Sequence, residues 1–363
     1  MEKTKRIGVL TSGGDCPGLN AVLRAVVKTA VGKGMEVIGF KDGYVGLVYN
    51  RFQKLGMEDV SGLIDKGGTI LGTTNSFNPF EVPFDKDGNV KVRDMTDRVR
   101  DTLAMHGIDG LIVIGGNNSI AIAAELSSRG IPVVAVPKTI ENDVPQTAMS
   151  FGFMTAVDTV TQAVDRLHST AESHHRVMVV EVVGAKTGWV ALHSGIAGGA
   201  DIILIPEIPY SINAVARKVL ERKNAGKGFS IIVVAEGCNP TGTGAPEAGG
   251  YFANTGDAIR FGGVGTDIAM ELEMLTRLEA RVTVLGYLQR SGEPSPADRI
   301  LTTRFGSAAV NLVAAGRFGK LVNIDGPEAA DIPLAEIAGK YRLVPVDGEL
   351  IQLARDLGVS FGE

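Results

Sequence analysis

The chain has 363 residues, of which 44% are hydrophobic, so it is long enough to bury a sizeable core in two lobes. Its 36 basic and 41 acidic residues leave a net charge of -5, which offers no general attraction to nucleic acid or to a membrane surface. A charged lead runs directly into a strand-like segment and no long uncharged apolar span follows, so we expect neither export nor membrane insertion. Cys16 and Cys238 lie far apart without the spacing of metal ligands, which favours a reducing, cytoplasmic location over a disulfide framework or structural zinc.

Short apolar, β-branched runs recur along the chain, each followed by a glycine-containing turn and a helical stretch. The predicted strands are Ile7–Thr11, Val37–Phe40, Leu111–Ile114, Val133–Val136, Val177–Val182, Ile202–Ile205 and Ile231–Ala235. Continuous apolar strands that alternate with helices are typical of parallel sheets covered by helices on both faces. The number of these units predicts an α/β protein with more than one sheet, and Cys238–Gly265 is its long predicted loop.

Two turns in the first half of the chain have the residues of a phosphate-binding site. Gly13 and Gly14 follow the first strand, and Gly115–Ser119 follow a later strand and precede a predicted helix, Ile120–Ser128, with Ser119 as its candidate cap. Backbone N–H groups exposed by glycine, together with a helix N-terminus, bind anions. Two such turns in one lobe predict a polyphosphate ligand, and tight strand-to-helix connections are the simpler alternative.

A third strand ends in Pro137–Asp143, which places a lysine and two carboxylates at the same predicted sheet edge. Glu141 and Asp143 are two residues apart, so in an extended strand end they face the same way. Such a pair suits a general base and a metal-facing group. A solvated acidic turn is the alternative interpretation.

Three further residues are interpreted as packing residues. Trp189 follows Gly188 at a predicted helix start and is expected in the core. Met270 and Met274 are one helical turn apart and are expected to pack within a helix.

From Ile7 to about Gly316 the sequence resembles the phosphofructokinase family. The matching segments are Ser12–Asn20, Gly67–Gly72, Pro137–Asp143, Ser173–Val177, Ala197–Ala200, Pro206–Tyr210 and Arg281–Arg290. The resemblance implies two Rossmann-like lobes with mainly parallel sheets and an active-site cleft between them. Residues 1–152 with 289–340 would form the donor lobe, and residues 153–288 with 341–363 the sugar-phosphate lobe. It also implies transfer of a phosphoryl group from ATP or pyrophosphate to fructose 6-phosphate, giving fructose 1,6-bisphosphate, with Mg²⁺ and in a homodimer or homotetramer.

The resemblance assigns an acceptor site of basic and polar residues. Arg281 and Arg290 match the pair that holds the 6-phosphate, and Arg176 matches an arginine that reaches the sugar phosphate from a neighbouring subunit. Arginine suits this role because its forked hydrogen bonds match a phosphate dianion. Residues assigned to the sugar phosphate are Arg176, Gly184, Glu236, Arg281, Tyr287 and Arg290, with Tyr287 replacing the usual histidine.

The resemblance also assigns catalytic and donor residues. Glu141 would act as the base, Asp143 would support the metal, and Thr139 would hold the acceptor together with Gly184. Residues assigned to the donor are Gly13, Gly14, Asn75, Ser76, Asn117, Asn118, Ser119 and Lys138, with Asn117 also facing the metal.

On this donor side the sequence departs from the family pattern. Asn117 replaces a magnesium-facing aspartate, Glu141 replaces the catalytic aspartate, and Ala185 replaces an arginine at the transferring phosphate. No basic residue stands near Asn75, and Asn118 matches neither the ATP nor the pyrophosphate pattern.

Three functions follow from this comparison, because phosphoryl transfer depends on positioning and on cations around the transferring group. The first is a phosphotransferase acting on fructose 6-phosphate or a close relative, with weak activity included. The second is a non-catalytic sugar-phosphate-binding or regulatory protein, such as a partner of an active paralogue. The third is a phosphotransferase with a different donor or acceptor.

Overall fold

The predicted apolar runs form parallel strands that are buried on both faces. In the computed structural model, which describes residues 5–86, 89–241 and 263–363, the strands β6 (Gly110–Gly115), β8 (Val177–Val182) and β10 (Ser230–Ala235) are buried along their whole length. Residues of this kind favour strands because branched side chains pack well on a pleated surface. Helices therefore cover both faces of the sheets, as the sequence predicts.

The chain divides into two units that exchange segments along the sequence. Unit 1 comprises Met1–Ile140, Val144–Met154 and Ser291–Tyr341, and unit 2 comprises Glu141–Asp143, Thr155–Arg290 and Arg342–Glu363. The assignment of one unit to the phosphoryl donor and the other to the sugar phosphate stays a prediction.

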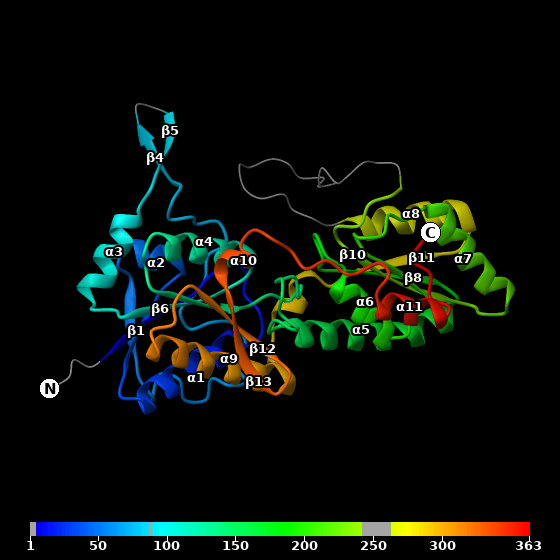
Figure 1. The fold of residues 1–363 in the computed structure, drawn as a ribbon. Helices are drawn as coiled ribbons and strands as arrows, with labels where there is room; N and C mark the ends of the chain where they lie inside the picture. Colours follow the sequence, from blue (N-terminus) through cyan, green and yellow to red (C-terminus); the bar gives the residue numbers. More distant parts are fainter. Residues whose placement is uncertain (1–4, 87–88, 242–262) are drawn as a thin grey trace. The chain divides into compact units, whose positions relative to one another are not determined.

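Unit 1 contains a seven-stranded sheet with the order β13-β12-β7-β6-β1-β2-β3, in which β3 and β13 are the antiparallel edge strands. A separate antiparallel pair, β4 and β5, projects from the unit (Figure 1). The strands are β1 (Arg6–Thr11), β2 (Glu36–Phe40), β3 (Phe52–Leu55), β4 (Val82–Lys86), β5 (Asn89–Arg93), β6, β7 (Val133–Pro137), β12 (Lys320–Asp325) and β13 (Glu328–Pro333).

Two groups of helices cover the large sheet of unit 1. Helices α1 and α9 pack together on one face, and α2, α3, α4 and α10 lie on the other (Figure 1). The helices are α1 (Leu19–Gly32), α2 (Tyr44–Val48), α3 (Thr96–Met105), α4 (Asn117–Ser128), α9 (Pro296–Ala314) and α10 (Leu334–Ile337).

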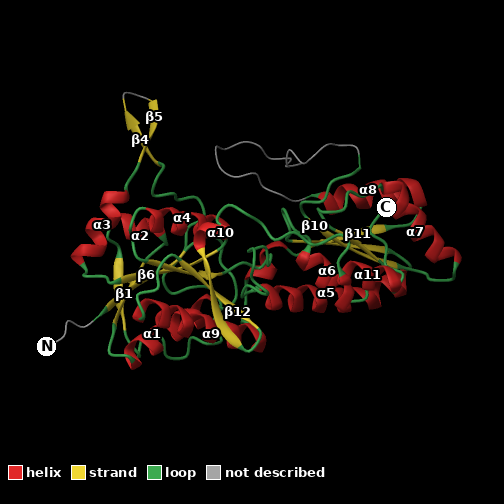
Figure 2. Ribbon diagram, in the orientation of Figure 1, coloured by secondary structure: helices red, strands yellow, loops and turns green. Residues whose placement is uncertain are grey.

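Unit 2 contains a four-stranded, all-parallel sheet with the order β11-β8-β10-β9. Helices α7 and α8 lie on one face, and α5, α6 and α11 on the other (Figure 2). The elements not yet given are α5 (Phe153–His174), α6 (Trp189–Ala197), β9 (Ile202–Leu204), α7 (Ile212–Asn224), α8 (Val264–Thr276), β11 (Ala280–Val284), the 3₁₀ helix η1 (Gly286–Arg290) and α11 (Glu349–Asp356).

Two sequence expectations concern segments at the limits of this description. Of the predicted loop Cys238–Gly265, residues 242–262 lie outside the described residues. Among the helices that the structure describes, none combines the length and the apolar character needed to cross a bilayer.

Candidate active site

In unit 1 the turns that follow three neighbouring parallel strands lie together at the carboxyl ends of those strands. β7, β6 and β1 are adjacent and parallel, so the turns that follow them lie side by side. The ammonium group of Lys138 donates to the carbonyl oxygen of Gly14, and the Ser119 hydroxyl donates to the Ser12 hydroxyl at 3.0 Å. A Cβ on Gly13 would lie 3.2 Å from Nζ of Lys138, so glycine permits this close approach. The structure thus brings together four of the predicted donor residues.

Helix α4 begins earlier than the sequence indicates. Its first residue is Asn117 and its N-cap is Gly116, which has no side chain to cap the helix, so the prediction of Ser119 as the cap is wrong. Asn117 and Asn118 therefore lie in the first helical turn. Backbone N–H groups in a first turn have no partner within the helix, which makes this end of α4 suitable for an anion.

The segment that carries Asn75 and Ser76 packs against the first glycine turn. The backbone N–H of Gly13 donates to the carbonyl of Thr74 at 3.1 Å, and the Thr73 hydroxyl donates to the carbonyl of Gly13 at 2.6 Å. Asn75 and Ser76 follow directly and are exposed. These two residues thus directly follow a segment that is hydrogen-bonded to the first glycine turn, on which a donor is predicted to bind.

The segment after β7 turns sharply instead of remaining extended. Asn142 has a φ of 52°, in the left-handed region, so the expectation that Glu141 and Asp143 share a face of an extended strand is wrong. The Ser150 hydroxyl holds this turn by donating to the carbonyl of Thr139 at 2.8 Å. The two carboxylates still interact electrostatically, because Asp143 raises the pKa of Glu141.

Glu141 lies beside the turn that follows β8 in unit 2. The backbone N–H of Ala185 donates to Oε2 of Glu141 at 3.2 Å, and the Thr187 hydroxyl donates to the Glu141 carbonyl at 3.3 Å. Burial raises the pKa of Glu141 to about 7, and the Asp143 and Glu236 carboxylates act in the same direction. The Arg290 guanidinium and the Ala185 N–H oppose this rise. A carboxyl group with such a pKa exchanges protons near neutral pH, which suits a general base.

Glu236 lies at the end of β10, against the same turn. Burial raises the pKa of Glu236, while a hydrogen bond from the Gly184 backbone and the charge of Arg290 oppose the rise. A Cβ on Gly184 would lie 2.7 Å from the carbonyl oxygen of Thr187, so only glycine allows this contact. Glu141, Gly184, Glu236 and Arg290 thus form one cluster within unit 2.

Gln289 connects this turn to the helix η1, and the sequence analysis did not single it out. Its side chain is fully buried, and its oxygen accepts from the N–H of Val183 at 3.2 Å. Its amide nitrogen donates to the carbonyl of Gly286 at 3.2 Å. The burial of this amide is visible only in the structure, where its oxygen and its NH₂ group satisfy backbone partners that would otherwise be buried without a hydrogen bond. Tyr287, in the same short helix, is 85% exposed.

Two predicted phosphate-binding arginines lie at the other end of the unit 2 sheet, where its parallel strands begin. Arg176 immediately precedes β8 and Arg281 is the second residue of β11, whereas Arg290 follows the end of β11. Arg176 donates to Glu279 at 2.5 Å, Arg281 also pairs with Glu279, and these contacts lower the pKa of that carboxyl. Within one chain the structure does not bring Arg281 to Arg290.

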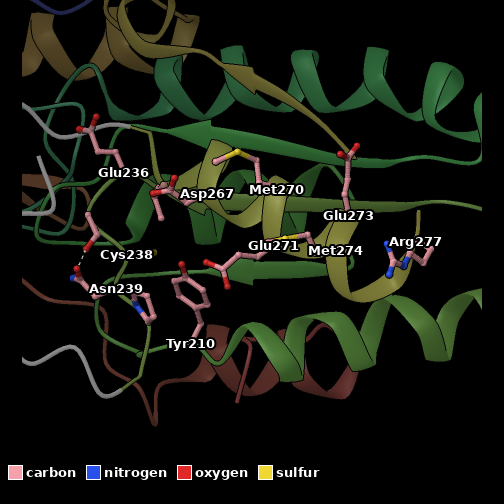
Figure 3. A pocket seen from close by; sticks show the side chains of 13 residues that line it. Tyr210, Glu236, Cys238, Asn239, Asp267, Met270, Glu271, Glu273, Met274 and Arg277 are labelled. Atoms are coloured by element: carbon pink, nitrogen blue, oxygen red, sulfur yellow. Dashed lines mark hydrogen bonds between the residues drawn. The ribbon is translucent and has the colours of Figure 1, made fainter. Parts of the chain in front are cut away.

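A cavity of about 870 Å³ lies next to Glu236, between the end of β10 and helix α8 (Figure 3). Its acidic lining residues are Glu236, Asp267, Glu271 and Glu273, and Arg277 adds a cation. This balance repels a phosphate dianion. Met270 and Met274 line the cavity and are 53% and 65% exposed, so their assignment to helix packing is wrong, whereas Trp189 is 6% exposed and lies in the core as predicted.

Comparison with known proteins identifies the family. Residues 6–313 match the family model for phosphofructokinase. The chain therefore belongs to the phosphofructokinase family.

Individual relatives match over almost the entire chain. An "ATP-dependent 6-phosphofructokinase" of Chloroflexus aurantiacus is 50% identical over 99% of both chains, and "ATP-dependent 6-phosphofructokinase 2" of Clostridium perfringens is 46% identical over 100% of both. The structure of Pichia pastoris phosphofructokinase in the T-state aligns with a TM-score of 0.79 and 30% identity, covering 93% of this chain. This chain spans 36% of that longer chain. The α/β fold of the family, expected from the sequence, is confirmed.

Proposed function

We propose that the protein transfers the γ-phosphoryl group of ATP to the 1-hydroxyl of fructose 6-phosphate. The observation that carries this proposal is the cluster around Glu141, where a carboxyl group with a pKa of about 7 adjoins Arg290 and Glu236. The hydroxyl proton passes to Glu141, and the hydroxyl oxygen forms a bond to the γ-phosphorus. The bond from that phosphorus to the bridging oxygen breaks, which releases ADP.

ATP is proposed as the donor because the curated relatives at 46% and 50% identity are named ATP-dependent. Unit 1 would hold it, since Gly13, Gly14 and the first turn of α4 offer backbone N–H groups and Lys138 adds a positive charge. Fructose 6-phosphate, as a glycolytic substrate, also agrees with the cytoplasmic location expected from the sequence.

Magnesium would enter as the MgATP complex. Magnesium in proteins is commonly held by one or two carboxylates together with substrate phosphates. Asp143 is 7% exposed and offers a carboxylate next to Glu141, and Asn117 offers a neutral amide oxygen at the start of α4. Each of these residues, taken by itself, offers an oxygen that suits a metal bringing most of its ligands with the nucleotide.

Unit 2 would hold the sugar phosphate, and we propose that two copies of the chain share each site. One group of predicted ligands lies together in a single chain: Gly184, Glu236 and Arg290. The other group lies around Glu279, where the strands of the unit 2 sheet begin: Arg176 and Arg281. Arginines placed there would act on the site of a neighbouring copy in a homodimer or homotetramer.

The departures at Asn117 and Ala185 concern the rate rather than the reaction type. An amide binds a hard cation less well than a carboxylate, and alanine supplies no charge to the transferring group. Nothing in the comparisons favours the alternative of a non-catalytic paralogue. If Asn117 and Ala185 affect the reaction, we expect them to lower its rate.

The deciding experiment measures fructose 1,6-bisphosphate formation with magnesium and either ATP or pyrophosphate, alongside calorimetric titration of fructose 6-phosphate. We expect turnover with ATP. Turnover with pyrophosphate alone would correct the donor, and binding without turnover with either donor would overturn the proposal in favour of a sugar-phosphate-binding protein.

A further inference from the structure

Glu207 is a carboxylate in unit 2 that accepts hydrogen bonds from two segments far apart in the sequence. The backbone N–H of Gly188 donates to both of its oxygens, at 3.1 and 3.0 Å, and the N–H of Val344 donates to Oε1 at 2.8 Å. Burial raises the pKa of Glu207, and these backbone donors oppose the rise. None of the functions proposed above uses this side chain.

The first segment leads from Gly188 to Glu141. Gly188 is the N-cap of α6 and closes the turn after β8. In that turn the N–H of Ala185 donates to the Glu141 carboxylate and the Thr187 hydroxyl donates to the Glu141 carbonyl. A Cβ on Gly188 would lie 2.3 Å from Cβ of Ile205, so this end of the turn is pressed against the chain beside Glu207.

The second segment leads from Val344 to Asp143. Two residues before Val344, the N–H of Arg342 donates to the Asp143 carbonyl at 2.8 Å. The Arg342 carbonyl accepts from the indole N–H of Trp189 at 2.9 Å, and its guanidinium lies 4.4 Å from the centre of that ring. Trp189 directly follows Gly188, so both segments converge on the same few residues.

We propose that Glu207 is a positioning residue that holds Glu141 and Asp143 in place from two sides. One carboxylate joins the turn that contacts Glu141 to the segment that contacts Asp143, and each segment would lose its anchor without it. Carboxylates suit this role because a single group accepts several N–H donors without adding a competing donor. The inference rests on the proposed function only for its kinetic consequence.

The test replaces the carboxylate by an amide in the full-length protein. In Glu207→Gln the new NH₂ group faces the Gly188 N–H in either orientation of the amide, and the Val344 N–H in one of them. A donor then faces a donor, so the hydrogen bonding to the first segment is weakened while size and shape are kept. We expect kcat to fall by about tenfold to a hundredfold, because small displacements of reacting groups cost this much. The KM for fructose 6-phosphate should change less than kcat, since Glu236 follows β10 and Arg290 belongs to η1, so neither lies in the turn that Glu207 anchors.

A matched control is Glu181→Gln. Glu181 is 2% exposed and its carboxylate also accepts backbone N–H groups, but these are the N–H groups of Gly263 and Gly265 at the start of α8 rather than those of the turn beside Glu141. This control should lose stability to a similar degree while its kcat stays near the wild-type value. Equal losses of kcat in both variants would reduce Glu207 to a merely structural role and overturn the inference.

Hydrogen exchange tests the positioning independently of turnover. In Glu207→Gln, and in Glu207→Asp should the first variant fail to fold, peptides containing Glu141–Asp143 and Gly184–Gly188 should exchange faster than in the wild type and in Glu181→Gln. Unchanged exchange there would overturn the inference. If the wild type shows no turnover, the proposed function fails, but the exchange rates still decide whether Glu207 holds these segments.

Discussion

At the scale of single residues, the raised pKa of Glu141 makes the proposed reaction dependent on pH. The group must be ionised to accept the hydroxyl proton, and burial together with Asp143 raises its pKa to about 7. Ionisation is complete above that pH and is lost below it. We therefore expect kcat to rise with pH through about 7, whereas an unperturbed glutamate would place this limb near 4.5.

The measurement is the pH profile of kcat at saturating MgATP and fructose 6-phosphate. A profile that stays flat down to about pH 5.5 would show that Glu141 is not the base, or that its environment differs from the one described. Glu141→Gln should remove the limb together with most of the activity.

Restoring a cation beside Glu141 is a second test at this scale. The N–H of Ala185 contacts the Glu141 carboxylate, so a guanidinium introduced by Ala185→Arg would lie close to it. We expect kcat to increase, because a cation stabilises charge on the transferring group. The limb in the pH profile should move to lower pH, because a positive charge favours the carboxylate. Ala185→Gln adds similar length without charge and should change neither quantity in this way.

At the scale of elements, the turn after β8 depends on close approach to the chain that follows β10. A Cβ on Gly237 would lie 2.0 Å from the carbonyl oxygen of Ala185, and backbone atoms cannot yield as a flexible side chain does. We expect Gly237→Ala to destabilise the protein by about 1–3 kcal/mol and to lower kcat, because Ala185 moves away from Glu141. Urea unfolding and steady-state kinetics measure the two effects.

Gly32→Ala is the control for this substitution. Gly32 lies in α1, where a Cβ meets nothing within 4 Å. Replacing a glycine in the middle of a helix by alanine stabilises by about 0.5–1 kcal/mol, so at Gly32, the last residue of α1, we expect unchanged stability or a gain of at most that size. A loss of stability there as large as that of Gly237→Ala would contradict the explanation by close approach.

The elements themselves were predictable from the sequence because their signals are local. Each apolar run, such as Leu111–Ile114, became a buried parallel strand. Errors arose where the outcome depends on chain geometry: α4 begins at Asn117 with Gly116 as its N-cap, ahead of the expected cap Ser119, and Asn142 bends the segment after β7. The assignment of Arg281 and Arg290 to one phosphate stays a prediction. Within one chain the strand β11, which advances about 3.3 Å per residue, places the two residues at opposite ends of the sheet.

At the scale of the whole molecule, a site shared between two copies predicts complementation. Arg176→Ala and Arg290→Ala should each abolish most activity as homo-oligomers. When the two variants are dissociated and reassembled together as a dimer, half the molecules are hybrids, and each hybrid has one intact site. About a quarter of the wild-type activity should therefore return.

Mixing Arg176→Ala with Arg281→Ala provides the matched control. Both arginines lie around Glu279, where the strands of the unit 2 sheet begin, and both are proposed to act on the neighbouring copy. Each site of a hybrid would therefore lack one of them, so the hybrid contains no intact site. Recovery of activity in this mixture, or no recovery in the first mixture, would show that Arg176 and Arg290 do not act on one site from two different copies.

The order of the segments also has a consequence for biosynthesis. The last segment of unit 2, Arg342–Glu363, is synthesised only after the later strands of unit 1. In this segment Ser360 exchanges backbone hydrogen bonds with Asp201 and Ile203 beside β9. Arg342 and Val344, which contact Asp143 and Glu207, belong to the same late segment. During translation unit 1 has all its strands before the segment that contacts Asp143 is made. A nascent chain would therefore acquire the turns proposed to bind the nucleotide well before unit 2 is complete.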